Sequence, residues 1–414
     1  MDTFDYKPKL QQDGGKDYSH GIPDLQKQIG RRLGKLLASP FQWKQHGDSG
    51  LWVSELFPHV SRHVDDLCVL KGMHTNGFDH GQAILRLHTG EDVQLRPSVG
   101  SWITYGLGTE NENLPGFISI SPQHSAVGTR GYGNAFLPAV YQGTPLGDEG
   151  RAIVDSSVRH LNNPYLPRDV QQAQLRRLAE RNHAHLRTRD DDPQLEGMIQ
   201  SFELAFRMQR EMPALIEMSD ESQSTLDAYG VGQQPTDNFA RGCILARRFA
   251  EAGVRYVQLT HRDPDNNGWD QHGHLLKGLR SNTAQVDQPI AALLADLKQR
   301  GLLDDTLVLW GGEFGRTSVN EGRGKGAGAE TGRDHNPLGF TMWLAGGGVK
   351  PGFSFGETDE YGYRAAVDKV HMHDLHATLL HLLGLDHERL TYRYAGRDFR
   401  LTDVHGRVVK QILA

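Results

Sequence analysis

Strand-length apolar runs alternate with helical segments through residues 240–383, and this alternation constrains the fold more than any other feature. The helical segments end at or just before a glycine, which is typical of helix C-termini. In chain order the segments are a helix at 240–252, a strand at 255–259, a helix at 283–300, strands at 306–310 and 340–344, and a helix at 374–383. Near-continuous apolar strands between helices favour a buried sheet. We therefore predict an α/β fold with a mostly parallel central sheet and helices on both faces.

The N-terminal part carries similar segments less regularly. Residues 51–66 place apolar side chains at helical spacing, and the run LCVL at 67–70 has the length of a buried strand. A further helix is predicted at 98–107 and a further strand at 116–120. These segments would add to the same layered core.

Residues 123–235 differ in character from the rest of the chain. They are polar and charged from 150 to 195, and a Met-rich and Phe-rich stripe at helical spacing follows at 196–219. Single cores stop growing at roughly 250–300 residues, and the chain has 414. We predict one large domain over residues 1–414 with a mainly helical insertion at 123–235.

Charge and hydropathy exclude several classes of partner. The formal net charge is −6 and the sequence pI is near 6.4, which argues against nucleic acid as a partner. No stretch approaches the roughly 20 apolar residues of a membrane span. Residues 1–10 contain no apolar run, so they are not a signal peptide. The sequence as written therefore predicts a cytoplasmic protein.

Polar side chains gather in the loop after the strand at 255–259. Ligands of open α/β sheets bind outside the C-terminal ends of the strands, and this loop carries Asp270, His272 and His274. Carboxylates and imidazoles are the ligands that Zn²⁺ and similar ions take. Asp270 and His274 are four residues apart, so one helical turn would put them on the same face. A solvated polar loop is the alternative interpretation of this segment.

Two more loops at strand ends carry chemistry. The run GGEFGRT at 311–317 places Glu313 and Arg316 between glycines, and a guanidinium suits a tetrahedral oxyanion. The run GRDHNP at 332–337 places Asp334 beside His335. Each motif alone also fits an ordinary surface pair. Together the three loops supply metal-binding groups to one edge of the predicted sheet. No nucleophile elbow, P-loop or dinucleotide fingerprint is present.

The order of these loops resembles the alkaline-phosphatase superfamily, in its sulfatase-like branch. The run TGRDH at 331–335 resembles the last histidine ligand of that superfamily. In the run at 308–315, Glu313 stands where most members have Asp, and Phe314 stands where they have a histidine ligand. Sulfatases carry a nucleophilic Cys or Ser nine residues before the Thr of a Thr-Gly pair, and here that position holds His80.

A narrower resemblance covers nearly the whole chain. It is to the family called domain of unknown function 1501, and its patterns are MDTFDYKP at 1–8, PSVGSW at 97–102, GWDQH at 268–272, GGEFGRT at 311–317 and GRDH at 332–335. Members usually begin earlier, with an export signal and a first strand. The resemblance thus implies that the domain lacks its first strand here. It also implies a periplasmic or extracytoplasmic location if the native N-terminus carries that signal.

The resemblance implies a metal-dependent hydrolase of sulfate or phosphate esters, acting on a small-molecule or carbohydrate ester. A divalent ion, Zn or Ca, would polarise the ester oxygen. The implied ligands are Asp270, His272, His274, Glu313, Asp334 and His335. Arg316 would stabilise the oxyanion, and His80 would act as a base or as a covalent nucleophile. The alternative is a non-catalytic metal- or ligand-binding protein on the same fold, since His80 and Phe314 replace two groups that activity uses.

Overall fold

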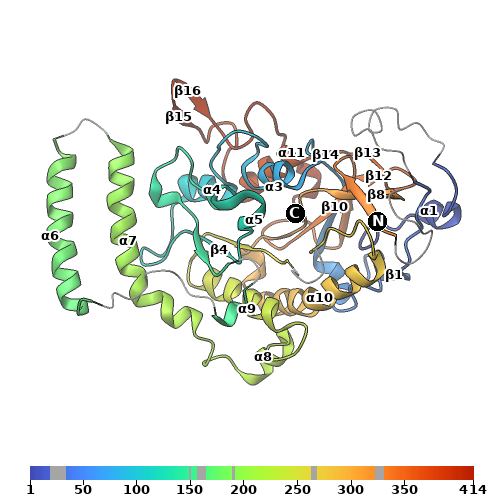
Figure 1. Cartoon of the computed structure of the whole chain (residues 1–414), viewed down its shortest axis with the longest axis horizontal. Helices are drawn as coiled ribbons and strands as arrows, with labels where there is room; N and C mark the ends of the chain where they lie inside the picture. Colours follow the sequence, from blue (N-terminus) through green and yellow to red (C-terminus); the bar gives the residue numbers. More distant parts are fainter. Residues whose placement is uncertain (19–33, 149–150, 156–164, 189–191, 263–267, 322–330) are drawn as a thin grey trace.

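The structure is a computed structural model that describes residues 1–18, 34–148, 151–155, 165–188, 192–262, 268–321 and 331–414. Within these residues the chain forms a mixed α/β fold (Figure 1). Two sheets, one of five strands and one of three, form its centre. Both sheets contribute loops to the candidate site described below.

The larger sheet is mixed rather than parallel. Its strands lie in the order β11 (Phe353–Phe355), β3 (Leu67–His74), β10 (Phe340–Ala345) and β7 (Val308–Trp310), and β14 (Val370–His371) also pairs with β3. The strand β10 runs antiparallel to both β3 and β7, whereas β11 and β14 run parallel to β3. A single antiparallel strand at the centre therefore separates β3 from β7.

The smaller sheet is parallel and has the order β5 (Thr144–Leu146), β4 (Phe117–Ile120) and β6 (Tyr256–Leu259). The strands thus divide into two sheets, whereas the sequence predicted one mostly parallel sheet. Among the described residues, β6 pairs only with β4, and β7 pairs only with β10. All residues of both strands are only partly buried, although most are apolar.

Helices cover both faces of the larger sheet, as the sequence predicted. On β3, Val69 packs toward α10 (Leu275–Gln299), and the neighbouring Leu70 packs toward α11 (Met372–Leu382). This division follows from the strand itself, since successive side chains point to opposite faces. The core is therefore a helix–sheet–helix sandwich at this strand.

Several predicted helices and strands are confirmed with small shifts in their bounds. The helix predicted at 98–107 is α4 (Val99–Leu107), and that predicted at 240–252 is α9 (Asp237–Glu251). The helix predicted at 283–300 begins earlier, as α10. The N-cap of α11 is His371, and Asp374 completes its capping box from the third helical position.

The helix predicted from residue 51 is wrong. Two strands, β1 (Trp43–His46) and β2 (Leu51–Ser54), form an antiparallel hairpin instead. The helical structure that follows is a short 3-10 helix, η1 (Val60–Asp66). Gly47 and Gly50 adopt positive φ angles of 64° and 66° in the connecting turn, which favours glycine there. Leu51 and Val53 are buried at a spacing of two, so the strand period decides the local structure.

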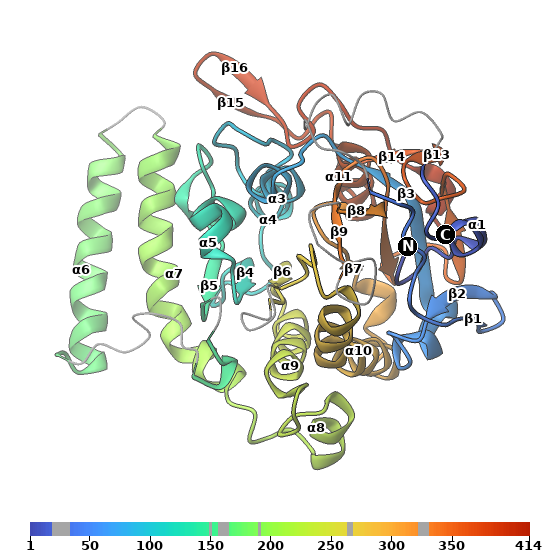
Figure 2. The ribbon, with the colours of Figure 1, turned by 45° about the vertical axis from the view of Figure 1, so that its right-hand side comes forward.

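Residues 123–235 are mainly helical but also contribute a strand. Their elements are α5 (His124–Val127), η2 (Gly128–Tyr132), η3 (Ala139–Tyr141), β5, η4 (Ile153–Asp155), α6 (Arg168–Leu186), α7 (Pro193–Ile216) and α8 (Gln223–Tyr229). The hairpin of α6 and α7 stands at one side of the molecule (Figure 1 and Figure 2). In the described part of the chain, no helix combines the length and apolar character needed to cross a membrane.

The remaining described elements complete the fold. They are α1 (Pro8–Asp13), α3 (His80–Thr89), η6 (Leu303–Asp305), β8 (Gly315–Asn320), β9 (Arg333–Asn336), β12 (Glu357–Thr358), β13 (Ala365–Val367), β15 (Tyr392–Tyr394), β16 (Arg397–Phe399) and η7 (Lys410–Ile412). Among these, α3 and the antiparallel pair β8–β9 carry residues of the site.

Candidate metal centre

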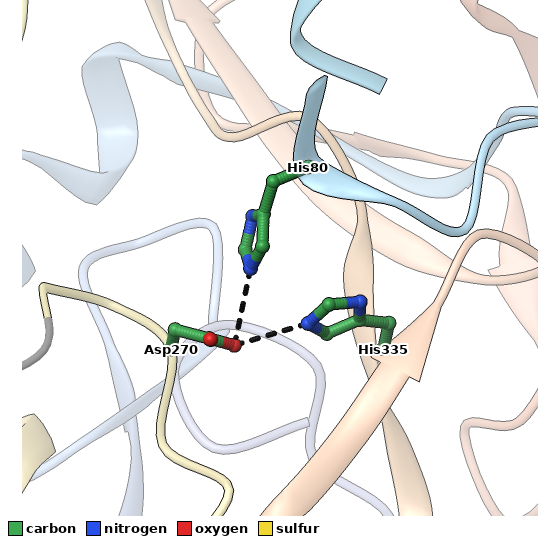
Figure 3. Close-up of side chains that lie close together, drawn as sticks. All are labelled: His80, Asp270 and His335. Carbon is green, nitrogen blue, oxygen red and sulfur yellow. Dashed lines mark hydrogen bonds and ion pairs between the residues drawn. The ribbon is translucent and has the colours of Figure 1, made fainter. Parts of the chain in front are cut away.

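Four separate segments bring ionisable side chains to one place. His80 is the first residue of α3, and Asp270 and His272 lie in the loop that precedes α10. Glu313 follows β7, and His335 lies on β9. Figure 3 shows His80 and His335 approaching Asp270 from two different elements. The loops expected to meet at one edge of the fold therefore do meet.

Each end of the His80 ring faces a carboxylate. Its Nδ1 lies 2.6 Å from Oε1 of Glu313, and its Nε2 lies 3.2 Å from Oδ1 of Asp270. Asp79 caps α3 by accepting a hydrogen bond from the backbone N–H of Gly81, which fixes the start of the helix and so the position of the ring. The buried Nε2 makes no hydrogen bond, because its approach to Asp270 lacks the required alignment.

His335 and His272 repeat the arrangement. In His335, Nδ1 lies 2.7 Å from the backbone carbonyl oxygen of Phe78, and Nε2 lies 3.1 Å from Oδ1 of Asp270. In His272, Nδ1 lies 2.8 Å from Oε2 of Glu321, and Nε2 lies 3.0 Å from the same Asp270 oxygen. Three imidazoles therefore turn their Nε2 atoms toward one carboxylate oxygen.

Arg316 approaches the same oxygen from β8. Its Nη1 lies 2.6 Å from Oδ1 of Asp270, and Nη2 donates to the carbonyl of Trp269 at 3.3 Å. The antiparallel pairing of Arg316 with His335 on β9 places both side chains at the site. The guanidinium adds a fixed positive charge beside the imidazoles.

Burial and the neighbouring charges oppose each other at this site. Burial would lower the pKa of His80, but its contacts with Asp270 and Glu313 outweigh this and raise the pKa to about 9. Burial would raise the pKa of Asp270, but the three imidazoles and Arg316 hold it well below its usual range. The bond to Asp270 also raises the pKa of His272. Without a cation, these contacts thus favour the protonated forms of His80 and His272 beside an ionised Asp270.

A second group of potential ligands borders the first. Nδ1 of His272 lies 2.8 Å from Glu321 and 3.9 Å from Oδ1 of Asp334, so these three residues could also hold an ion. Asp334 is buried, and its Oδ1 accepts a hydrogen bond from the backbone N–H of His335. His272 belongs to both groups, through a different ring nitrogen in each.

The structure brings together most of the residues singled out in the sequence. His80, Asp270, His272 and Glu313 join directly through the contacts above, as do Arg316, Asp334 and His335. His274 is not part of the cluster. Residues 270–274 are not helical, since α10 begins at Leu275, and the exposed His274 has a left-handed φ of 52°. The shared helical face that motivated its choice does not exist. Asp263 and Asp265 of the same loop lie outside the described residues.

Two groups at the site were missed in the sequence. Glu321 follows β8 and precedes a Gly-rich stretch. No strand was predicted from the sequence at β8, and no motif includes Glu321, so this residue was not selected. The Phe78 carbonyl is a backbone atom, which no residue pattern identifies. Phe78 lies in the Gly-rich and His-rich run after β3, and this composition was the one feature of the sequence that could have pointed to it.

Phe314 lies at the position where the resemblance to the alkaline-phosphatase superfamily implies a histidine ligand. Its ring centroid lies 5.0 Å from that of His80 and 4.5 Å from that of His335. An aromatic ring offers a packing surface but no lone pair. Phe314 therefore orients two imidazoles and leaves the ligand atoms to its neighbours.

Comparison with known proteins places the whole chain in one family. The model described as "Protein of unknown function (DUF1501)" matches residues 1–413. The chain belongs to this family. No curated protein matches it.

Two solved structures are similar to this DUF1501 protein at low sequence identity. Ps i-CgsB in complex with k-i-k-neocarrahexaose is 12% identical with a TM-score of 0.40, over 80% of this chain and 67% of that one. The phosphonate monoester hydrolase SpPMH from Silicibacter pomeroyi is 13% identical with a TM-score of 0.39, over 86% of this chain and 71% of that one.

Proposed function

We propose that this protein is a metal-dependent hydrolase of sulfate or phosphate esters. The observation that carries the proposal is the convergence of three imidazole Nε2 atoms on Oδ1 of Asp270, within 3.0–3.2 Å. Nitrogen and carboxylate ligands at this spacing suit a divalent ion. The buried Nε2 of His80 contacts Oδ1 of Asp270 at 3.2 Å but makes no aligned hydrogen bond, and a bound cation would satisfy both atoms.

The surroundings of the cluster support ester hydrolysis in particular. A bound divalent ion would polarise the ester oxygen and lower the pKa of bound water. Arg316, only about one-fifth exposed, offers a planar guanidinium for a tetrahedral sulfate or phosphate oxyanion. The cluster side chains remain between 17% and 34% exposed, so a small-molecule or carbohydrate ester could reach it.

The experiment combines metal analysis with a substrate screen. The purified full chain, loaded with Zn²⁺ or Ca²⁺ in turn, is assayed on aryl sulfates, aryl phosphates and phosphonate monoesters. We expect hydrolysis that depends on the ion and disappears with a chelator. We also expect Asp270→Asn to remove it. The matched control is His183→Ala, which disrupts the His183–Glu203 pair on the α6–α7 hairpin and should leave activity unchanged. A metal-loaded protein that hydrolyses none of these esters would contradict the proposal.

A second candidate, a non-catalytic binding protein, is favoured by one observation. Phe314 packs against both His80 and His335, so an apolar ring covers one side of the cluster. In that case the protein would bind its ion and an ester or oxyanion without turnover. Equilibrium binding of sulfate or phosphate to the metal-loaded protein, measured together with the screen above, separates the two candidates.

A further inference from the structure

The Nδ1 atoms of the three imidazoles are all engaged by acceptors other than Asp270. They face Glu313, Glu321 and the Phe78 carbonyl, at 2.6, 2.8 and 2.7 Å. A carbonyl oxygen only accepts, so Nδ1 of His335 must carry its proton. The same tautomer in His80 and His272 lets each ring donate to its carboxylate. The Nε2 lone pairs are then left facing one another around Asp270.

This arrangement is the one that metal-bound histidines show. A ligating imidazole usually donates its other N–H to a carboxylate or a backbone carbonyl, which fixes the tautomer and the ring orientation. Zinc–nitrogen bonds are about 2.0–2.1 Å long, so tetrahedral ligand atoms lie about 3.3–3.4 Å apart. The Nε2 atoms of His272 and His335 lie 3.1 Å apart, and all three Nε2 atoms lie 3.0–3.2 Å from Oδ1 of Asp270. Four of the six separations among these four atoms therefore lie near the tetrahedral value, and the ligand atoms of His80, Asp270 and His335 all lie within 4.8 Å of one another.

His272 also decides between one ion and two. The group of His272, Glu321 and Asp334 would use Nδ1, whereas the group around Asp270 would use Nε2. A neutral imidazole has only one nitrogen lone pair in the ring plane, so His272 serves one ion in its ordinary form. The 2.8 Å contact between Nδ1 and Glu321 is a good hydrogen bond, whereas Asp334 lies farther away at 3.9 Å. The geometry therefore favours Nε2 as the ligand atom.

We infer that the site holds a single transition-metal ion of the zinc class, bound by Nε2 of His80, His272 and His335 and by Oδ1 of Asp270. Glu313, Glu321 and the Phe78 carbonyl are positioning groups that hold the rings and do not touch the ion. The inference refines the metal centre of the proposed function and rests on it only for the identity of the site. Ca²⁺ is disfavoured, because it takes six to eight oxygen ligands.

The assignment gives His80 and Glu313 new roles. His80 becomes a ligand rather than a base or nucleophile, since its Nε2 would be bound. Glu313 becomes the acceptor that orients it. The ligand side chains of the set are between 17% and 34% exposed, so solvent reaches the ion from one side. A fifth position for water or an ester oxygen is compatible with a zinc site that expands its coordination.

The first test uses the unmodified full chain and no substrate. Metal analysis after loading with Zn²⁺ should give one ion per chain. X-ray absorption at the zinc edge should give three imidazole nitrogens and one oxygen at about 2.0–2.2 Å. Two ions per chain, or a shell made mainly of oxygen, would overturn the inference. Because no ester is involved, this result does not depend on whether the protein is a hydrolase.

The second test separates ligands from positioning groups. Glu321→Gln should weaken zinc binding about 10–100-fold but keep one ion per chain. His272→Ala should weaken it further. Glu203→Gln, which changes the distant His183–Glu203 pair, is the matched control and should bind zinc normally. If Glu321→Gln instead lowers the stoichiometry from two ions to one, Glu321 is a ligand of a second ion and the inference is wrong. The thermal midpoints of the metal-free variants show whether each one folds.

Discussion

The Nε2 atoms of His272 and His335 lie 3.1 Å apart, and both face Oδ1 of Asp270. Two lone pairs repel at that distance, so a proton or a metal ion must lie between them. The acceptors that hold the two Nδ1 atoms leave these lone pairs available to a cation. A proton or a metal ion can therefore occupy the same space between the two rings, beside the guanidinium of Arg316.

Replacing Arg316 should separate catalysis from metal binding. Arg316 is not a ligand, but it lies 2.6 Å from Asp270 and faces the same space. If it stabilises an oxyanion, Arg316→Ala should lower kcat/KM on the best ester by about 100–1,000-fold, while the zinc content stays at one ion per chain. Arg316→Lys keeps the charge and should retain part of the activity. Equal activity of Arg316→Ala and the unmodified protein would remove the guanidinium from the mechanism.

Asp2 and Arg333 form a buried ion pair that should matter for stability. Arg333 is fully buried, and Nε and Nη2 donate to the two carboxylate oxygens of Asp2 at 2.7 and 3.0 Å. Removing one partner of a buried pair leaves an uncompensated charge and costs about 3–5 kcal/mol. Asp2→Asn should therefore lower the free energy of unfolding by about that amount, as measured by chemical denaturation. The exposed pair of Arg393 and Asp398 is the control, and Asp398→Asn should cost less than about 1 kcal/mol.

In the α6–α7 hairpin, a substitution at an exposed position of α6 should affect stability less than one at a buried position of α7. Met212 on α7 is fully buried in the cluster around β4 and β6, whereas Leu178 on α6 is 45% exposed. Met212→Ala should cost about 2–5 kcal/mol, because it leaves a cavity. Leu178→Ala should cost well under half of that. Similar thermal midpoints for the two variants would mean that α7 does not anchor the hairpin as described.

The sequence predicted the individual elements better than their pairing. Continuous apolar runs identified β6, β7 and β10 to within two residues, since local composition decides whether a buried strand forms. The antiparallel direction of β10 depends on which strands lie beside it, and an apolar run carries no information on direction. At 51–66 the four apolar positions at helical spacing were misleading, because two glycines with positive φ close a hairpin just before them.

Most residues of the candidate site were predicted from the rule that ligands gather at strand ends. The prediction of site residues failed where the local backbone departs from regular secondary structure. Asp270, Glu313 and His335 follow or adjoin predicted strands, so the rule selected them. His274 was included on the assumption of a helical turn that the structure does not have. Glu321 belongs to the site only because the pairing of β8 with β9 folds it back toward His272. That fold-back depends on tertiary pairing, which spacing along the chain does not encode.

Acid should destabilise the fold through His376, a buried histidine far in sequence from the metal cluster. His376 on α11 is 1% exposed, and its Nε2 donates to the carbonyl of Leu87 at 2.8 Å. Burial lowers the pKa of His376 to about 3, whereas an unfolded chain would bind a proton near pH 6.5. Between these values the unfolded state takes up the proton and the folded state does not, so stability is present above pH 6.5 and falls as the pH drops toward 3.

At pH 5 this linkage amounts to about 2 kcal/mol for one such histidine. His376→Gln keeps an N–H donor for Leu87 but cannot titrate. The loss of stability between pH 7.5 and pH 5, measured by chemical denaturation at both values, should therefore be about 2 kcal/mol smaller in this variant than in the unmodified protein. His381→Gln, on the exposed face of the same helix, is the control and should leave the loss unchanged. An equal loss in His376→Gln and the unmodified protein would show that other histidines, such as the partly buried His371 with its pKa lowered by burial to about 3, carry the acid sensitivity instead.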